Sequence, residues 1–447
     1  MAIFKAYDIR GVVPDELNAE IAYGIGRATA RFVGAESLVV GRDARSHSPE
    51  LCQALVRGIT DEGVSVIDLG LAATPMMYFA VAETGAGGGV MVTASHNPGE
   101  YNGFKICREK AIPIGEASGL KEIEALVQAC ADAPPVSPRG SVVERDVRGG
   151  YAEQALSVGT GRPAVRAAID CGNGMASVGL EPVLEALKIE VERLYFEPDG
   201  TFPNHEADPL KVENLSDVSE AVRRVGADFG VAFDGDADRA VFVDEQGRPV
   251  ASDLMTGLLA RYQLARNPGG LVLYDLRSSR AVAEEIEQAG GRAEMCRVGH
   301  SFVKAHMRES GAIFAGELSG HTYFRFDNDL IADDAIATFV ALLDVLAVEG
   351  RPLSEIVAPL RRYHASGEIN RRVRDTAAVL GAMEAEHAGA PTVSKLDGLL
   401  VGYSDWWFNL RPSNTEPVLR LNLEAESEAK MVEERDRILD QVEKIGA

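Results

Sequence analysis

Three aspartates stand at alternate positions in the segment DGDADR (234–239), directly after the apolar run FGVAF (229–233). Asp234, Asp236 and Asp238 lie so close together in sequence that their charges repel unless a cation is bound. Carboxylate oxygens suit Mg²⁺ or Ca²⁺ rather than Zn²⁺. An EF-hand is disfavoured because the Gly and Glu that complete its loop are missing. The pattern therefore favours a metal site over a solvated acidic turn, and Arg239 makes sense there if an anion shares the site.

A possible nucleophile lies in VTASHNPGEYNGFK (92–105), where Ser95 follows an apolar run and Lys105 comes ten residues later. A loop of this composition at the end of a strand presents its hydroxyl outward. Serine is a poor nucleophile unless a base or a metal assists it. Taken alone, the segment favours an ordinary Ser/Asn/Pro turn.

Two later loops carry groups that bind sugars and anions. In GELSGH (316–321), Glu317, Ser319 and His321 have the short polar side chains that suit sugar hydroxyls, although a surface turn is the plain alternative. In RPSNTEP (411–417), the guanidinium of Arg411 matches the geometry of phosphate. Further hydrogen bonds there come from three small polar residues, Ser413, Asn414 and Thr415. These donors favour an anion site over a plain strand-to-strand turn.

Two isolated residues complete the candidates. Arg10 lies in FKAYDIRG near the start of the chain, and His300 lies in VGHS before a predicted helix. A single histidine is more often structural than catalytic, so neither residue indicates a function by itself.

The elements that must position these loops alternate between strand-like and helix-like runs, which predicts α/β layers. Three segments share an apolar strand, an aspartate and a polar loop that opens a helix: 39–48, 167–177 and 271–280, with Asp43, Asp170 and Asp275. Each is followed by a second strand and loop, at 89–98, 229–239 and 312–321. This weak repeat predicts three similar units whose ligands bind at the strand ends.

The length of 447 residues suggests three to four domains. The Pro-rich stretch DAPPVSPRG (132–140), the turn VDEQGRP (243–249) and the region 350–365 are the expected boundaries. We therefore predict domains at 1–140, 141–247, 248–360 and 361–447, the last a smaller α+β domain with a charged helix from about 427.

Composition excludes several classes of function. A net charge of -23 is too negative for a protein whose main partner is a nucleic acid or an anionic membrane. No apolar run approaches the ~20 residues of a membrane-spanning helix, and the start lacks a signal peptide. The five cysteines show no C-x-x-C spacing, which is typical of reduced thiols in a cytoplasmic protein.

Together and in this order, the four loops resemble those of the α-D-phosphohexomutase superfamily, most closely its bacterial phosphomannomutase/phosphoglucomutase branch. The resemblance extends from FKAYDIRGVV at residue 4 to RPSNTEPVLRL at residue 421. It implies four domains around a central cleft, three of them similar mixed α/β domains, with each domain contributing one loop.

The resemblance also implies a role for each matching residue. Ser95 matches the serine that is phosphorylated in the resting enzyme, and a phosphoserine oxygen completes the Mg²⁺ site of the three aspartates. Arg239 and Lys105 match the basic residues beside the transferring phosphate, and Glu317 and Ser319 match the sugar-hydroxyl contacts. Arg10 and His300 match cleft residues of catalysis or substrate contact. Arg411, Ser413, Asn414 and Thr415 match the clamp on the phosphate that is not transferred. The departures are DGDADR for DGDGDR, which requires Ala237 to take angles usual for Gly, and Leu for Met in GELSGH.

The implied activity interconverts the 1-phosphate and the 6-phosphate of mannose or glucose. A phosphoserine enzyme and a hexose 1,6-bisphosphate intermediate carry the phosphoryl group, with one Mg²⁺ per site and the bisphosphate as activator. Lys105 with a lowered pKa, or His300, is the expected general base. The expected partner is a small phosphosugar, and the expected assembly is a monomer or a dimer.

Three alternatives remain open at this point. A phosphoglucosamine mutase of the same family differs only in its sugar. A phosphatase of the haloacid dehalogenase type would use Asp234 as its nucleophile and leave Ser95 incidental. A non-catalytic sugar-phosphate sensor would need neither a nucleophile nor a metal.

The acidity of the chain does not exclude an anionic substrate. The candidate side chains comprise four cations and four carboxylates: Arg10, Lys105, Arg239 and Arg411, and Asp234, Asp236, Asp238 and Glu317. Their charges cancel, and salt screens the remaining surface charge over about 8–10 Å.

Overall fold

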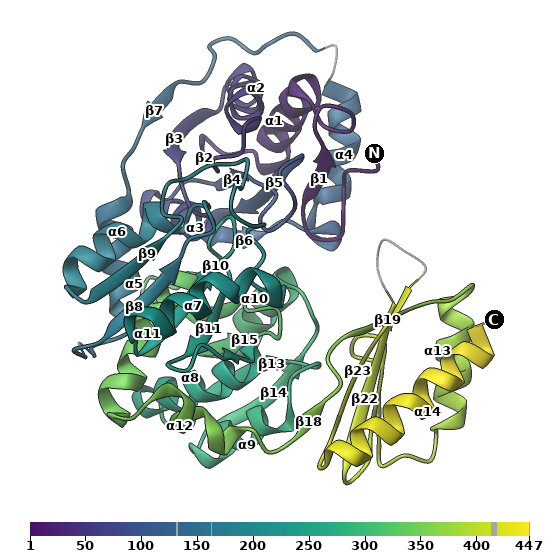
Figure 1. Cartoon of the computed structure of the whole chain (residues 1–447). Coiled ribbons are helices and arrows are strands. Elements are labelled where there is room, and N and C mark those ends of the chain that lie inside the picture. Colours follow the sequence, from purple (N-terminus) through teal and green to yellow (C-terminus); the bar gives the residue numbers. More distant parts are fainter. Residues whose placement is uncertain (131–132, 162, 413–417, 447) are drawn as a thin grey trace.

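The computed structural model describes residues 1–130, 133–161, 163–412 and 418–446. Within them the strands form four sheets, each built from one continuous part of the chain (Figure 1). The parts are called domains I to IV in chain order. The predicted architecture of three mixed α/β domains and a smaller α+β domain at the C-terminus is confirmed.

Domain I carries a seven-stranded sheet in the order β1-β5-β4-β2-β3-β7, with β6 paired to β5. Its core places α1, α2 and α4 against one face of the sheet and α3 against the other. Its elements are β1 (Ile9–Val12), α1 (Ala19–Val33), β2 (Ser37–Arg42), α2 (Ser48–Asp61), β3 (Ser65–Leu71), α3 (Thr74–Thr84), β4 (Gly88–Val92), β5 (Tyr101–Arg108), β6 (Ile112–Pro113), α4 (Leu120–Cys130) and β7 (Val142–Glu144).

Domains II and III each carry a five-stranded sheet, in the orders β12-β11-β10-β8-β9 and β14-β13-β15-β16-β17. Domain II contains α5 (Arg148–Ser157), β8 (Arg166–Asp170), α6 (Ala176–Leu187), β9 (Glu190–Leu194), α7 (Ser216–Val225), β10 (Phe229–Phe233), β11 (Ala240–Asp244) and β12 (Pro249–Val250). Domain III contains α8 (Ser252–Arg266), β13 (Leu271–Asp275), α9 (Arg280–Gln288), β14 (Arg292–Cys296), α10 (His300–Ser310), β15 (Phe314–Gly316), β16 (Thr322–Arg325), β17 (Ile331–Asp333), α11 (Ala335–Glu349) and α12 (Leu353–Val357).

Domain IV has a different design, an antiparallel sheet in the order β18-β23-β22-β21-β20 with β19 on β23. In Figure 1 it stands to one side of the other three domains, with α13 and α14 along it. Its elements are β18 (His364–Ala365), β19 (Ile369–Arg372), α13 (Thr376–Glu386), β20 (Thr392–Ser394), β21 (Leu399–Gly402), β22 (Trp406–Pro412), β23 (Val418–Ala425) and α14 (Glu428–Gly446).

The predicted repeat of domains I to III is confirmed by their strand pairing. In each domain the first and second strands of the repeat are parallel neighbours: β2 with β4, β8 with β10, and β13 with β15. Each repeat aspartate accepts the backbone N–H two residues later, at 3.0 Å for Asp43, 2.8 Å for Asp170 and 2.7 Å for Asp275. The three polar loops therefore begin with the same local turn.

The domain boundaries expected at 140, 247 and 360 remain predictions. The structure adds that β7 pairs with β3, so the first sheet extends to Glu144.

The start of α2 differs from the usual reading of a Ser-Pro helix start. Ser48 does not cap α2, because its hydroxyl donates to Asp43 Oδ1 instead at 2.5 Å.

Domain IV has a hydrophobic core that is separate from the core of the other three domains. One cluster runs through domains I, II and III and includes Met76, Tyr151 and Phe339. The core of domain IV is a cluster of its own, formed by residues between Val373 and Val442. Since a shared core resists relative movement, domains I to III form one framework and domain IV is attached to it.

All five cysteines are buried and free of disulfides. Among the described residues, every helix is too short or too polar to cross a membrane.

Candidate active site

Ser95 lies in the loop that joins β4 to the antiparallel strand β5. Its backbone is left-handed, with φ 52°, a conformation that is uncommon for residues other than Gly. The backbone N–H donates to Thr93 Oγ1 at 2.9 Å, and the hydroxyl Oγ donates to Asp234 Oδ2 at 2.8 Å. The turn thus directs the buried hydroxyl at the acidic loop of domain II.

Arg45 holds the backbone of this serine loop. Its guanidinium donates to the carbonyl oxygens of Ser95 at 2.8 Å, Asn97 at 2.6 Å, Pro98 at 2.6 Å and Tyr101 at 3.1 Å. Only 1% of Arg45 is exposed, and Asp43 Oδ2 accepts its Nε at 3.1 Å. The repeat aspartate of domain I therefore supports the serine loop through one buried arginine.

The acidic loop follows β10, as the sequence predicts. Asp234, Asp236 and Asp238 are fully buried, and each offers an oxygen within 4.8 Å of the other two. Asp236 Oδ1 finds no hydrogen-bond donor among the described residues. Ala237 adopts φ 62°, so it takes the angles that the loop requires. An all-oxygen donor set with an unsatisfied buried oxygen fits a hard divalent cation such as Mg²⁺.

The charges of this loop are balanced by Lys105, which projects from β5. Its Nζ donates to Asp236 Oδ2 at 2.5 Å and also contacts Asp238 Oδ2. Burial and the neighbouring charges of Asp238 and Asp236 raise the pKa of Asp234 well above its usual range. Burial also acts to raise the pKa of Asp238, but Lys105 and His321 outweigh it and hold that pKa well below its usual range.

The expected lowered pKa of Lys105 is wrong for this arrangement. Burial alone would lower the pKa of the ammonium, but the charges of Asp236, Asp238 and Asp234 outweigh burial and raise it. Lys105 therefore serves here as a counter-ion and a hydrogen-bond donor, not as a neutral amine.

The GELSGH loop of domain III lies against the acidic loop of domain II. Arg239 and His321 form an isolated β-bridge, and Ala240 N donates to Gly320 O at 3.3 Å. Glu317 is 1% exposed, and its Oε1 accepts the N–H of Gly299 at 2.7 Å. The loop thus joins the metal loop on one side and the start of α10 on the other.

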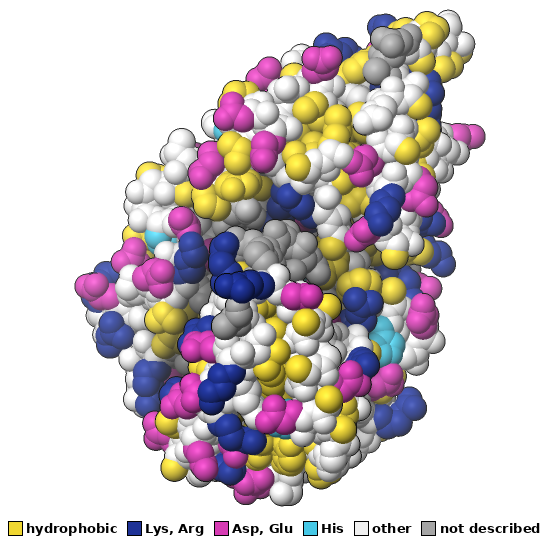
Figure 2. All heavy atoms as spheres, turned by 90° about the vertical axis from the view of Figure 1, so that its right-hand side faces the viewer, with side chains coloured by type: hydrophobic (Ala, Val, Ile, Leu, Met, Phe, Trp, Pro, Cys, Tyr) yellow, Lys and Arg dark blue, Asp and Glu magenta, His cyan; other side chains and the backbone are white. Residues whose placement is uncertain are grey.

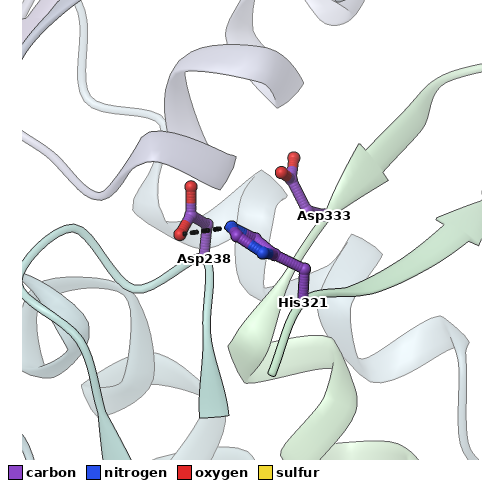
Figure 3. A group of neighbouring side chains, drawn as sticks. All are labelled: Asp238, His321 and Asp333. Atoms are coloured by element: carbon purple, nitrogen blue, oxygen red, sulfur yellow. Dashed lines mark ion pairs between the residues drawn. The ribbon is translucent and has the colours of Figure 1, made fainter. Parts of the chain in front are cut away.

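His321 links two carboxylates and a hydroxyl of the site. Its Nε2 lies 3.3 Å from Asp238 Oδ1, and its Nδ1 lies 3.0 Å from Ser319 Oγ and 3.5 Å from Glu317 Oε2. Figure 3 shows the imidazole between Asp238 and Asp333, with Asp238 on the end of one loop and Asp333 on a strand of domain III. Sequence reasoning did not find Asp333, which is fully buried and pairs with Lys304 at 2.8 Å.

His300, the other candidate histidine, begins α10. Its ring is stacked 6.4 Å from that of His321 and meets Tyr7 edge-on at 6.0 Å. Burial and the nearby charges of Lys304 and Lys105 lower the pKa of His300 well below its usual value, so the ring is neutral. Its Nδ1 has no hydrogen-bond partner within the described part of the chain.

Arg10, at the edge of the first sheet, contacts the serine loop. Its Nη1 donates to Ala94 O at 3.3 Å and contacts Asn97 Oδ1, while Nε donates to Asp8 Oδ2 at 2.7 Å. The structure therefore brings Arg10 to the same loop as Ser95, as expected.

The phosphate-clamp candidates lie in domain IV. Arg411 is near the end of β22, 8% exposed, with its Nε unpartnered among the described residues. Ser413, Asn414 and Thr415 lie outside the described residues. Glu368 is shared by Arg411 at 3.8 Å, Arg277 at 3.7 Å and Arg420 at 3.2 Å. Arg277 also pairs with Asp275 at 2.6 Å, so the three guanidinium groups face two carboxylates. Guanidinium groups of this kind can donate to a phosphate.

A cavity of about 510 Å³ is lined mainly by domain I and also by two residues of domain III and one of domain IV, and none of the candidate residues lines it. Its lining includes Tyr7, Arg297, Phe302 and Asp397. Figure 2 views the molecule from the side of domain IV and shows Lys and Arg side chains beside the hollow in the middle of this face. The volume lies in the range of small-molecule sites.

Comparison with known proteins identifies the family. Four family models match in order: phosphoglucomutase/phosphomannomutase alpha/beta/alpha domain I at residues 1–133, domain II at 151–247, domain III at 251–363, and the C-terminal domain at 368–441. The chain belongs to the phosphoglucomutase/phosphomannomutase family. Its activity is that of this family, an isomerase that moves a phosphoryl group on a phosphohexose.

Similar proteins cover the whole length of the chain. A phosphomannomutase of Salmonella montevideo is 39% identical over 98% of both chains, and a phosphoglucomutase of Neisseria gonorrhoeae is 39% identical over 96% of this chain and 94% of its own. The crystal structure of a phosphoglucomutase/phosphomannomutase family protein from Burkholderia thailandensis is 35% identical, with a TM-score of 0.91 over 100% of this chain and 98% of that one. The resemblance drawn from the four loops is thereby confirmed.

Proposed function

We propose that this chain interconverts the 1-phosphate and 6-phosphate of mannose or glucose, with Ser95 as the residue that carries the phosphoryl group. The observation that supports this most directly is the hydroxyl of Ser95, which lies 2.8 Å from Asp234 Oδ2 in a left-handed turn. Arg10, Lys105 and Arg239 lie around the same point and offer the positive charge that phosphoryl transfer needs.

Asp234, Asp236 and Asp238, together with an oxygen of phosphorylated Ser95, would hold Mg²⁺. When bound, the ion offsets the negative charge of the phosphoryl group that is transferred. Lys105 keeps Asp236 and Asp238 in place, since its ammonium contacts both carboxylates.

The transfer itself has a simple balance of bonds. The bond from phosphorus to Ser95 Oγ breaks, a bond to the attacking sugar oxygen forms, and the proton of that sugar hydroxyl must move to a base. Because Lys105 is charged, a histidine is the better acceptor. His321 lies beside Asp238 and Arg239, with Nε2 3.3 Å from Arg239 Nε, whereas His300 stacks behind it. We therefore propose His321 as the base, with His300 as the second candidate.

The second half of the reaction needs the intermediate to turn around. The hexose 1,6-bisphosphate presents its other phosphate to Ser95, while the phosphate that is not reacting binds near Arg411. A clamp on a separate domain can accept either phosphate, since it need not alter the reacting groups. Glu317 and Ser319 would contact the sugar hydroxyls between the two phosphates.

The rival reading as a phosphatase that uses Asp234 is disfavoured by the environment of that residue. Asp234 Oδ1 accepts the N–H groups of Asp238 at 3.1 Å and Arg239 at 3.2 Å, and Oδ2 accepts the hydroxyl of Ser95. These contacts hold the loop and aim the hydroxyl of Ser95 at Asp234, a contact that the phosphatase reading leaves without a purpose.

A coupled assay with Mg²⁺ and a trace of bisphosphate tests this function and its sugar. We expect turnover of mannose 1-phosphate and glucose 1-phosphate to exceed that of glucosamine 1-phosphate. A preference for glucosamine 1-phosphate would replace the proposed substrate with that of a phosphoglucosamine mutase. Inactivity on all three sugars would refute the proposal.

A further inference from the structure

We propose that Asp397 of domain IV is a positioning residue that links the phosphate clamp to the sugar contact Glu317 through the segment 297–299. The inference rests on the proposed function, in which domain IV binds one phosphate and Glu317 contacts the sugar. Two adjacent N–H groups carry the link. That of Val298 donates to Asp397 Oδ2 at 3.2 Å. That of Gly299 donates to Glu317 Oε1 at 2.7 Å.

The peptide unit between Val298 and Gly299 is held at both of its polar ends. Its carbonyl oxygen accepts the hydroxyl of Tyr7, from domain I, at 3.4 Å. Its N–H is the group that donates to Glu317. Because a peptide unit is planar, the carbonyl and the N–H cannot turn independently. A shift of Val298 therefore changes the direction in which the next N–H meets Glu317.

Gly299 lets domain I pack directly on this backbone. Its φ is 121°, a conformation that favours Gly, and a Cβ at this position would lie 2.9 Å from the ring of Tyr7. Burial and the nearby charge of Asp397 raise the pKa of Tyr7, so its hydroxyl keeps the proton that it donates. Domain I thus fixes one side of the segment, and Asp397 supplies the contact from domain IV.

Asp397 is tied to the phosphate clamp by the turn that carries it. Gly398 has φ 74°, and a Cβ there would lie 2.2 Å from Leu410 O and 2.9 Å from the Cα of Arg411. The carbonyl oxygen of Asp397 accepts Asn409 Nδ2 at 3.0 Å. The turn therefore packs on the backbone of the clamp, and the carboxylate of Asp397 keeps a fixed position relative to Arg411.

Glu317, at the other end of the link, belongs to domain III. It is 1% exposed, and its Oε2 accepts the hydroxyl of Tyr323 and lies 3.5 Å from His321 Nδ1. The N–H of Gly299 completes the support of this carboxylate at Oε1. Binding of a phosphate at the clamp and the correct orientation of Glu317 therefore favour each other, because both depend on the same segment.

The first test is hydrogen exchange of the full-length protein without substrate, read at single amides, for the wild type and Asp397→Ala. We expect exchange at both Val298 and Gly299 to become at least about fivefold faster, although the carboxylate that accepts from Gly299 is still present. Glu426→Ala, which removes an exposed carboxylate of the same domain, is the matched control and should leave both rates unchanged. Faster exchange at Val298 alone, or no change at either amide, would overturn the proposal.

A double-mutant cycle with Glu317→Ala tests the same link during turnover. Asp397→Ala alone should lower kcat about tenfold with a smaller change in KM, because the orientation of the sugar is lost rather than the clamp. Asp397→Asn should recover most of this rate, since its amide oxygen still accepts the N–H of Val298. In the Glu317→Ala background, Asp397→Ala should cost less than about twofold.

Two kinetic results would contradict the link: equal losses in both backgrounds, or a rise in KM at unchanged kcat. If the wild type turned over none of the sugar phosphates, the proposed function would fail. The exchange measurement would still decide whether Asp397 controls the N–H of Gly299, since it needs no substrate.

Discussion

The serine and metal loops differ from the phosphate clamp in how they are attached to the molecule. Ser95, the three aspartates and the GELSGH loop are fixed to one another by buried contacts among domains I, II and III, which share a continuous core. Arg411 belongs to domain IV, which has its own core. In the proposed function, the region where bonds break is the rigid one, and the region that only binds a phosphate is a separate body.

Domain IV meets domain III through a set of hydrogen bonds, an ion pair and one apolar cluster. Arg280 of α9 donates to the carbonyl oxygens of Tyr403 at 2.5 Å, Ser404 at 2.9 Å and Trp406 at 3.1 Å. A small apolar cluster of Leu276, Leu400 and Trp407 lies nearby. This difference teaches that the reacting groups need fixed positions, whereas the clamp must let the substrate enter and turn.

The largest loss of activity is expected from a substitution in the metal loop, at the centre of the rigid region. Asp236→Asn removes the charge of a metal ligand and one partner of Lys105, so kcat should fall by at least about 10³-fold. Steady-state kinetics measures this loss. Asp436→Asn, an exposed carboxylate on α14, is the matched control and should leave kcat unchanged. A loss of less than tenfold in Asp236→Asn would contradict the metal assignment.

A smaller effect is expected from loosening the serine loop without touching the reacting groups. Arg45→Lys cannot reproduce the planar set of donors to four carbonyl oxygens, so Ser95 loses its fixed orientation. We expect kcat to fall about 10- to 100-fold with little change in KM. The measurement is the rate at which Ser95 gains phosphate from bisphosphate, followed by intact mass.

Arg57→Lys, in which the exposed guanidinium over Tyr23 is replaced, is the control for this arginine. If Arg45→Lys transferred phosphate at the wild-type rate and only melted earlier, Arg45 would be structural alone.

A substitution in the phosphate clamp should change KM more than kcat, the opposite of Arg45→Lys. Arg411→Ala removes a charge-assisted contact to the phosphate that is not transferred, worth about 1.5–3 kcal/mol, so KM should rise about 10- to 100-fold and kcat should change less. Neutralising three exposed carboxylates of α14, Glu433, Asp436 and Asp440, should change KM less than twofold because salt screens them. Equal effects on KM from both variants would show that the overall charge, not the clamp, governs binding.

The smallest effect is expected at the connection between the two regions. Arg280→Ala removes three hydrogen bonds to domain IV, and hydrogen exchange at residues 403–406 should increase while the exchange of the serine loop stays unchanged. We expect kcat to change only severalfold. Faster exchange in both regions would mean that domain IV is not a separate body.

Much of this arrangement follows from the sequence, because the reactive residues lie in short loops directly after apolar strands. The repeat aspartates and the acidic loop were predictable from local pattern, whereas the left-handed position of Ala237 followed from the resemblance to the family's DGDGDR loop. These features depend on residues that are close together in sequence, so a sequence motif can identify them.

The support of the site could not be predicted in the same way. Arg45 contacts carbonyl oxygens some 50 residues further along the chain. Every residue has a backbone carbonyl oxygen, so residue types do not reveal such contacts. Lys304 and Asp333 come together only when α10 packs beside β17. The error at Lys105 has a similar origin. Burial lowers the pKa of a lysine unless carboxylates surround it, and the three carboxylates that raise the pKa of Lys105 all come from domain II.

The central claim is that Ser95 carries the phosphoryl group, and the mass of the intact protein tests it most directly. After incubation with hexose 1,6-bisphosphate and Mg²⁺, the wild type should gain the mass of one phosphate, and Ser95→Ala should gain none. Peptide mapping should place the phosphate within residues 92–105. A wild type that stays unmodified while turning over substrate, or a Ser95→Ala variant that still gains the phosphate, would contradict the account.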